Sequence, residues 1–341
     1  WERPGQRRLA ARAAMRAGSR TKGQVGVSSQ VNARRQAPAT ATESCESGCR
    51  IPRAHRLHIM PEFIDAHGIA IVYDVYPAEA PRGVVQLAHG VGEHAGRYAE
   101  LIAALVADGY SVYADDHRGH GRTGMKQHGG DVSKLGRLGP GGMNATVAAL
   151  WQFTQLIRDE NPNLPLVLLG HSWGSFLSQM LLNDHPEAYD AVVLSGTALR
   201  WPGSMNGGDL NAPWKSKDAS GLEWLSRDPA VAQAFKDDPL TTETPLLKLF
   251  GVVEAAKLFG RPRKHLGRDV PVLIMVGRDD TVGGALSAHK LAQAYRERSG
   301  LSDVTTLIYP DARHEIFNEL DQAATRADLL AWLDARIPAR A

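Results

Sequence analysis

Short apolar runs that alternate with amphipathic helical patterns constrain the fold of this chain more than any other feature. The apolar runs lack the polar alternation of a half-exposed strand, so both faces of each strand are expected to be buried. A strand that is buried on both faces needs helices on both sides of its sheet. The pattern predicts strands at residues 84–88, 111–114, 166–169, 191–194, 270–276 and 305–309, and helices at residues 98–107, 144–158, 173–183, 285–296 and 324–335. We therefore expect an α/β fold with a doubly wound, mostly parallel sheet.

Two segments depart from this alternation. Residues 62–65 and 69–76 are short alternating runs separated by Ala-His-Gly, which predicts an antiparallel hairpin ahead of the main sheet. Strand patterns are then absent from residues 199–269, although the alternation resumes after them. We expect this segment to be an insertion within one domain that spans residues 60–341.

The insertion is expected to be a helical cap. Asp228 and Thr244 are each followed by a proline, which is the arrangement of a capping residue ahead of the first helical position. The apolar side chains of the insertion, including Leu246, Phe250 and Val253, are expected to pack onto the main domain. The sequence thus predicts two cap helices that begin near these two prolines.

Residues 1–59 differ in composition from the rest of the chain. They contain twelve Lys and Arg residues against three Glu residues, a net charge of +9, whereas the whole chain carries +2. They also lack a periodic apolar pattern, so we expect a largely unstructured upstream or vector-derived segment ahead of a natural start at Met60. Basic charge without a fold or interleaved aromatic residues does not predict a nucleic-acid partner.

The remaining body is expected to be a soluble, cytoplasmic protein. Both cysteines, Cys45 and Cys49, lie in the N-terminal segment, so the body has no thiol for a disulfide or a zinc site. No apolar run approaches the roughly 20 residues that span a bilayer, and no apolar signal-peptide core lies near the N-terminus. The sequence carries no signal for a particular oligomeric state.

A lone serine between two glycines is the strongest chemical signal. Gly-His-Ser-Trp-Gly at residues 170–174 directly follows a predicted strand and begins a predicted helix, which is the setting of a nucleophile elbow. The glycines permit a very tight turn, and the turn exposes the hydroxyl of Ser172 at the carboxyl edge of the sheet. The N-terminus of the following helix directs N–H groups to the same place.

A serine hydroxyl needs a base to take its proton and an acid to orient that base. The expected order is serine, acid, histidine, each after a later strand. His314 follows the strand at residues 305–309, and Asp279 and Asp280 follow the strand at residues 270–276. Either aspartate could turn toward the histidine from so short a loop, and we favour Asp280.

The reaction also needs donors for the oxygen that becomes negatively charged. One is expected to be the backbone N–H of Trp173, directly after the serine. The loop after the strand at residues 84–88 offers the second, the backbone N–H of Val91.

Six motifs together resemble the monoacylglycerol lipase and lysophospholipase branch of the serine α/β-hydrolases. They are Leu-Ala-His-Gly-Val-Gly-Glu-His-Ala-Gly-Arg-Tyr (87–98), Asp-His-Arg-Gly-His-Gly-Arg-Thr (116–123), Gly-His-Ser-Trp-Gly (170–174), Arg-Asp-Pro-Ala-Val (227–231), Asp-Pro-Leu (238–240) and Asp-Ala-Arg-His-Glu (311–315). The resemblance runs from about Pro61 to the C-terminus.

This resemblance implies an α/β-hydrolase fold with a helical cap and no cofactor. It implies hydrolysis of a carboxylic ester with one acyl chain and a small alcohol, so that the partner is a small-molecule ester or lipid. By motif matching it assigns the nucleophile to Ser172, the acid to Asp280 and the base to His314, and the oxyanion donors to Val91 and Trp173. The cap is expected to supply an apolar wall for the acyl chain, with Trp201 and Met205 as candidates. Whether the cap makes transient contact with membrane surfaces is left open.

The chain departs from the family pattern in three places. Members usually carry Met where this chain has Trp173, Gly where it has Ser175, and Ser where it has Thr123. The indole beside the nucleophile leaves the acyl-chain length and the substrate open. A lysophospholipase and a general short-chain carboxylesterase remain as alternatives, as does an amide substrate.

Three other interpretations fit the sequence less well. Gly90-Val91-Gly92-Glu93-His94-Ala95 has the spacing of a dinucleotide fingerprint, but Glu93 would place a carboxylate where the pyrophosphate binds. His89, His94, His117 and His120 lack the spacing of a metal motif and are expected to hydrogen-bond the loops around the oxyanion donors. A protein that only binds an acyl ligand would be expected to lack one of the catalytic residues, and none is missing here.

Overall fold

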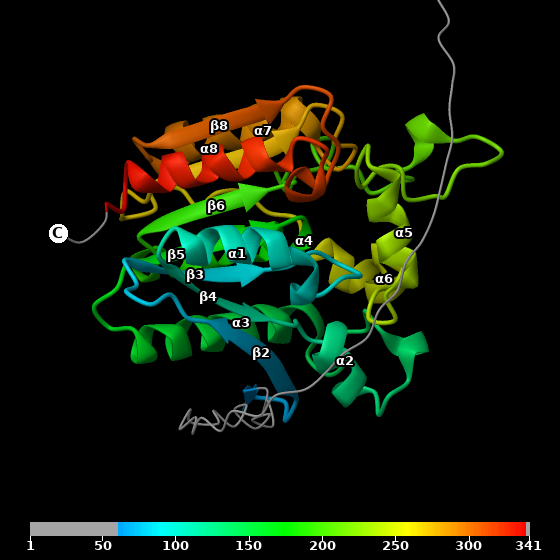
Figure 1. Ribbon diagram of the computed structural model, residues 1–341, viewed down its shortest axis with the longest axis horizontal. Helices are drawn as coiled ribbons and strands as arrows, with labels where there is room; N and C mark the ends of the chain where they lie inside the picture. Colours follow the sequence, from blue (N-terminus) through cyan, green and yellow to red (C-terminus); the bar gives the residue numbers. More distant parts are fainter. Residues whose placement is uncertain (1–60, 339–341) are drawn as a thin grey trace, which may run out of the picture. The chain divides into compact units, whose positions relative to one another are not determined.

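The computed structural model describes residues 61–338, in which helices cover both faces of one central sheet (Figure 1). The N-terminal segment predicted at residues 1–59, with its two cysteines, lies outside the described residues. The strands are β1 (Glu62–Ile64), β2 (Ala70–Tyr76), β3 (Gly83–Ala88), β4 (Tyr110–Asp115), β5 (Leu166–His171), β6 (Ala191–Ser195), β7 (Val272–Gly277) and β8 (Val304–Tyr309). The helices are α1 (Ala99–Ala107), α2 (Gly121–Gln127), α3 (Gly142–Glu160), α4 (Trp173–Asp184), α5 (Pro229–Asp237), α6 (Leu246–Ala256), α7 (Gly284–Gln293) and α8 (Gln322–Asp334).

The strand order is β1-β2-β4-β3-β5-β6-β7-β8, and all pairs from β4 to β8 are parallel. Only β1 with β2 and β2 with β4 are antiparallel. This order confirms the predicted mostly parallel sheet and the predicted hairpin. Because parallel strands end at the same edge, the loops after β3, β5, β7 and β8 meet there.

Successive side chains of the central strands point into two different cores. Val84 and Leu168 belong to the core under α3, α4 and α7, whereas Val85 and Leu169 belong to the core under α1 and α8. The strands are buried along their whole length for this reason, and they read as continuous apolar runs. Figure 1 shows α1 and α8 in front of the sheet and α3 behind it.

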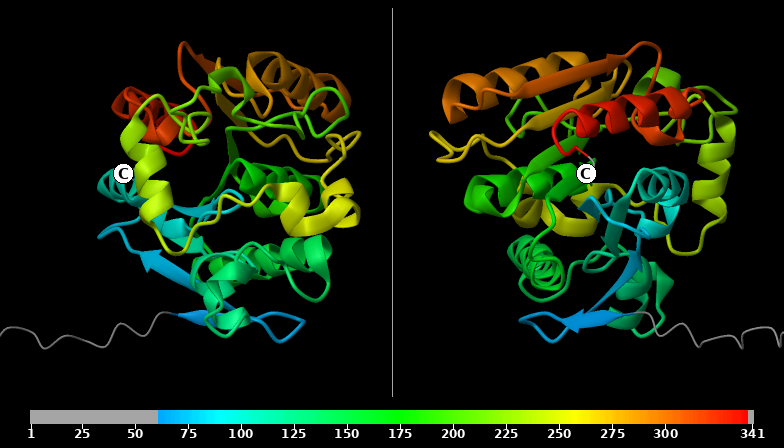
Figure 2. Two further views of the ribbon diagram at one scale, coloured as in Figure 1. Left: turned by 90° about the vertical axis from the view of Figure 1, so that its right-hand side faces the viewer. Right: turned by 60° about the vertical axis from the view of Figure 1, so that its left-hand side comes forward.

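The insertion at residues 199–269 contributes no strand to the sheet and carries α5 and α6. Figure 2 shows both helices beside the sheet rather than over either of its faces. Asp228 caps α5 as predicted, since its side chain accepts the N–H of Ala230 at 2.9 Å. The prediction that Thr244 caps the next helix is wrong, because Pro245 occupies the cap position and α6 begins at Leu246.

Two further features of the structure, the exposure of Val253 and the presence of helix α2, differ from what the sequence predicts. Phe250 is buried as predicted, but Val253 is 73% exposed, because α6 is kinked at Gly251, whose φ is 74°. Helix α2 was not predicted, because its glycine-rich sequence has no apolar periodicity.

Among residues 61–338, no helix is both long enough and apolar enough to cross a bilayer.

A buried ion pair fixes the hairpin to the rest of the sheet. Arg118 is 1% exposed and pairs with Asp65, which lies in the turn between β1 and β2. Its guanidinium also donates to the carbonyl oxygen of Leu138 at 3.1 and 3.2 Å. The pair therefore joins the hairpin to the loop that precedes α3.

We predict that Arg118→Leu lowers the free energy of unfolding by about 3–5 kcal/mol, because it leaves the carboxylate of Asp65 buried without its partner. The matched control is Lys126→Leu, which removes the exposed pair with Glu62 on the same hairpin and should cost less than about 1 kcal/mol. Chemical denaturation of both variants measures the difference. Equal losses would contradict the dominant role of the buried pair.

Candidate active site

Ser172 lies in a sharp turn between β5 and α4. Its φ of 53° and ψ of −122° are a conformation that residues with side chains rarely adopt. A Cβ at Gly170 would overlap Ser178 Oγ, and a Cβ at Gly174 would overlap the carbonyl oxygen of Ala88. The strand, turn and helix predicted around Ser172 are therefore confirmed, together with the need for both glycines.

His314 and Asp280 form a buried pair in the loops after β8 and β7. The imidazole Nδ1 lies 3.0 Å from the carboxylate Oδ1, and the two residues are 1% and 4% exposed. The same Oδ1 accepts the N–H of Val282 at 2.8 Å, which orients the carboxylate. Asp279 is exposed, and its backbone N–H donates to the carbonyl of Ala312. The structure thus brings Asp280, and not Asp279, to the histidine.

The pKa of His314 is raised above its usual value of 6.5. Burial alone would lower the pKa, but the negative charges of Asp280, Glu315 and Glu93 outweigh this effect. His171, which precedes the serine, shows the opposite behaviour: burial and the nearby charge of His314 lower its pKa to about 3. The pKa shift therefore favours the neutral form of His171 near neutral pH.

In residues 61–338, no hydrogen bond joins Ser172 to His314. Among the described residues, His314 Nε2 has no hydrogen-bond partner. The rings of His171 and His314 are 4.8 Å apart, and a Cβ at Gly196 would lie 3.0 Å from the Cε1 of His314. The imidazole of His314 therefore lies beside His171, the residue that precedes Ser172. Its Nε2 has no hydrogen-bond partner among the described residues.

The loop after β3 passes against the serine. A Cβ at Gly90 would lie 3.1 Å from the Cβ of Ser172. The N–H of Gly90 donates to Glu93 Oε1 at 2.6 Å, which holds the loop in shape. The N–H groups of Val91 and Trp173 donate to no other residue in the part of the chain that the structure describes. For Trp173 this follows from its position as the first residue of α4, where an N–H has no acceptor within the helix.

A buried cationic side chain links this loop to the histidine loop, and sequence reasoning missed it. Arg97 donates to Glu93 Oε2 at 2.5 Å and to both carboxylate oxygens of Glu315 at 2.7 and 2.9 Å. Tyr98 donates to Glu93 Oε1 at 2.5 Å. All four residues lie within the motifs quoted above, but a motif does not reveal which charges meet in space.

The buried histidines hydrogen-bond the loops, as expected. His89 joins the carbonyl of Gly90 at 2.7 Å to the N–H of His117 at 2.9 Å. Burial lowers the pKa of His120 to about 4. Within residues 61–338, no group of three or more His, Cys, Asp or Glu side chains is arranged to hold a metal ion.

The two predicted pocket residues occupy different environments. Trp201 is 41% exposed, and the guanidinium of Arg261 lies 3.5 Å above its ring. Met205 packs against the core, and the next residue, Asn206, donates its N–H to the carbonyl of Val282 near Asp280. These surroundings do not place either side chain against Ser172 or His314, so their role in the pocket stays a prediction.

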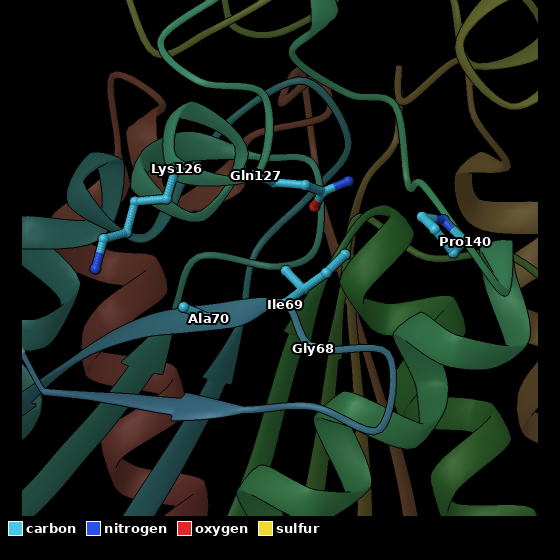
Figure 3. Close-up of a pocket in the computed structure, with 6 residues that line it drawn as sticks. All are labelled: Gly68, Ile69, Ala70, Lys126, Gln127 and Pro140. Carbon is cyan, nitrogen blue, oxygen red and sulfur yellow. The ribbon is translucent and has the colours of Figure 1, made fainter.

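A separate pocket of about 360 Å³ lies between the β1–β2 hairpin and α2 (Figure 3). It is lined by Gly68, Ile69, Ala70, Lys126, Gln127 and Pro140. Its polar side chains already have partners, since Lys126 pairs with Glu62 and Gln127 accepts the N–H of Gly119. None of the predicted site residues lines this pocket, and we do not consider it the functional site.

Comparisons with known proteins identify the family of this chain. The model of the family described as serine aminopeptidase S33 matches residues 79–321. A monoacylglycerol lipase of Mycolicibacterium smegmatis is 33% identical over 284 residues, which cover 80% of this chain and 95% of that protein. The monoglyceride lipase of Homo sapiens is 25% identical, with coverage of 84% and 94%.

Solved structures support the same fold. A thermostable carboxyl esterase from Bacillus coagulans in complex with glycerol superposes with a TM-score of 0.71 and 23% identity, covering 82% of this chain and 98% of that chain. A soluble variant of the monoglyceride lipase from Saccharomyces cerevisiae with a substrate analogue has a TM-score of 0.61 and 24% identity, with coverage of 79% and 92%. The chain belongs to the serine aminopeptidase S33 family of α/β-hydrolases.

Proposed function

We propose that the protein is a serine hydrolase that cleaves carboxylic esters of single acyl chains through an acyl-enzyme, in the manner of monoacylglycerol lipases. The observation that carries the proposal is the buried His314–Asp280 pair beside the strained turn of Ser172. The relatives named monoacylglycerol or monoglyceride lipase, at 25–33% identity, support the same substrate class.

In the proposed reaction, His314 takes the proton of Ser172 as the hydroxyl attacks the ester carbonyl. Asp280 holds the imidazole by its Nδ1–H and stabilises the positive charge that forms on it. The serine must approach Nε2 to transfer its proton, and such contacts often tighten only when substrate binds. The imidazolium then protonates the departing alcohol, and His314 activates water against the acyl-enzyme.

The N–H groups of Val91 and Trp173 are the proposed donors to the oxyanion. Both lie next to the serine turn and have no acceptor among the described residues. A helix N-terminus adds a favourable dipole at Trp173. Each such donor contributes about 3–4 kcal/mol to the transition state in comparable enzymes.

The alternative functions differ in the length of the acyl chain and in the alcohol portion of the substrate. A general short-chain carboxylesterase and a lysophospholipase would use the same machinery, and the family description also names an aminopeptidase. A rate profile over 4-nitrophenyl esters of increasing acyl length, together with a monoacylglycerol, a lysophospholipid and an aminoacyl anilide, separates these substrates. A short-chain optimum without glyceride turnover would favour the carboxylesterase.

Substitution of the proposed catalytic groups tests the mechanism. We expect Ser172→Ala to abolish ester hydrolysis and Asp280→Asn to reduce kcat by about 10³–10⁴-fold, because the amide no longer orients or stabilises the imidazolium. The matched control is Asp279→Asn, at the exposed neighbour, which should retain activity close to that of the unmodified protein. Turnover that persists in Ser172→Ala would remove the serine from the mechanism, and the opposite ranking of the two aspartates would reassign the acid.

The raised pKa of His314 predicts the pH dependence. The base must be neutral to accept the proton, so activity is present above its pKa and is lost as the pH falls through it. We therefore expect the acid limb of kcat/KM to have its midpoint above 6.5. The measurement is a pH profile with an ester that does not itself titrate. A midpoint below 6.5 would mean that the neighbouring carboxylates do not act on this base.

The cap is the proposed place of transient contact with a membrane that carries the lipid substrate. It exposes large apolar side chains, namely Trp201, Leu247, Val252, Val253 and Phe259. Residues 246–268 also contain six cationic side chains and one acidic side chain. Apolar groups bordered by cations fit a surface that contains anionic lipid.

We expect the protein to sediment with vesicles of phosphatidylcholine and phosphatidylglycerol and to bind less to phosphatidylcholine alone. Replacing both Val252 and Val253 by serine should weaken this binding, because their side chains are 72% and 73% exposed. The control is Leu320→Ser, which removes another exposed apolar side chain outside the cap. Equal binding by both variants would contradict docking through the cap.

A further inference from the structure

We propose that Trp224, in the insertion, is a positioning residue for the imidazole of His314. The inference rests on the proposed function. It assigns a role in the chemistry, and not only in substrate binding, to a side chain of the cap.

Within residues 61–338, the imidazole of His314 has only one hydrogen-bond partner. Its Nδ1 is paired with Asp280, and its Nε2 has no partner among the described residues. A single hydrogen bond fixes one point of a ring but not the tilt of its plane, so packing must supply the rest. Two rings lie within 5 Å of the imidazole: Trp224, with ring centroids 4.9 Å apart and planes at 37°, and His171, at 4.8 Å and 50°.

The backbone around Trp224 is attached to the histidine loop. The N–H of His314 donates to the carbonyl of Trp224 at 3.3 Å, and the N–H of Glu315 donates to the carbonyl of Leu225 at 2.7 Å. Arg313 donates to the carbonyl oxygens of Glu223 at 2.6 Å and Ser226 at 3.0 Å. Four contacts over four consecutive residues keep this part of the insertion against the loop that carries the proposed base.

The indole is also anchored from within the insertion. The backbone N–H of Trp224 donates to Asn211 Oδ1 at 2.9 Å, which fixes the main chain that carries the indole. Its side chain packs against a small cluster of Leu222, Leu225, Ala232 and Phe235, which includes one face of α5, and it also touches the main core. The packing of Trp224 thus holds its ring in place. A side chain that positions another group must itself be held in this way.

The electronic character of the two rings suits a base that becomes positively charged. The face of an aromatic ring is electronegative and attracts cations. Among the aromatic side chains, the indole of tryptophan does so most strongly. His171 stays neutral because its pKa is lowered to about 3, so it does not repel the imidazolium. The other charged groups close to His314 are Asp280, Glu315, Glu93 and Arg97. Trp224 therefore adds a neutral, polarisable contact to an imidazole that has one hydrogen-bond partner among the described residues.

The test compares Trp224→Leu and Trp224→Phe in the full chain. Leucine removes the ring and leaves the backbone contacts, whereas phenylalanine keeps an aromatic face. The matched control is Trp151→Leu, because Trp151 also packs on a histidine, His185, with ring centroids 3.6 Å apart, but on α3 and away from His314. Thermal unfolding of each variant accompanies the kinetics.

We expect Trp224→Leu to lower kcat by about 10- to 100-fold, since small displacements of a reacting group have effects of this size. The fold-loss should be the same for 4-nitrophenyl acetate and for 4-nitrophenyl decanoate, with KM little changed. Trp224→Phe should recover most of the activity, and Trp151→Leu should match the unmodified protein.

Other outcomes overturn the inference. A loss that grows with acyl length and appears in KM would make Trp224 a wall of the acyl pocket only, and equal kcat for Trp224→Leu and Trp151→Leu would leave it without a role. If Trp224→Leu does not fold, Trp224→Met replaces it, and equal activity of the Met and Phe variants contradicts the proposal. Ser172→Ala is measured in parallel: if it stays active, the proposed function fails, whereas an inactive Ser172→Ala with an active Trp224→Leu overturns only this inference.

Discussion

The strained backbone of Ser172 is the constraint on which the rest of the site depends. A residue with a side chain is held at positive φ, in a conformation that costs about 1–3 kcal/mol. Around this turn β3, β5 and α4 approach so closely that a Cβ at Gly90 would lie 3.1 Å from the Cβ of Ser172 and a Cβ at Gly174 would overlap the backbone of Ala88. The buried parallel strands supply the packing that offsets this strain. The sheet therefore both orients the serine and sets which loops can reach it.

Charge is distributed unevenly around the histidine. Asp280, Glu93 and Glu315 are three buried carboxylates, and Arg97 contributes one positive charge to the same region. The excess of negative charge favours the protonated imidazole of His314, which is the form that appears during proton transfer. His171, which is just as buried, makes its one hydrogen bond to the neutral Ser195 Oγ and loses its proton readily. Two neighbouring histidines thus have pKa values that are shifted in opposite directions by their surroundings.

The sequence predicted the features that depend on local periodicity or on strict chain order. The alternation of apolar runs and helices gave the parallel sheet, and the order of Ser172, the aspartates and His314 gave the loops that meet at its carboxyl edge. It favoured Asp280 over Asp279 without excluding Asp279, because one residue in a loop changes which side chain points inward. It also missed the contacts of Arg97 with Glu315 and of Trp224 with His314. Each joins residues more than 80 positions apart, and no periodic pattern encodes such pairs.

The insertion is attached to both loops around the serine, and this limits how the site can open. On one side the N–H of Thr242 donates to the carbonyl of Gly92 at 2.8 Å, and His94 Nε2 lies 2.8 Å from Asp238. On the other side Leu225 accepts the N–H of Glu315. A rigid swing of the whole insertion would break all of these bonds, and each buried polar group left without a partner costs about 1–3 kcal/mol. The insertion and the loops that carry the proposed base and oxyanion donors are therefore held together, so a movement that leaves these loops undisturbed must take place within the insertion.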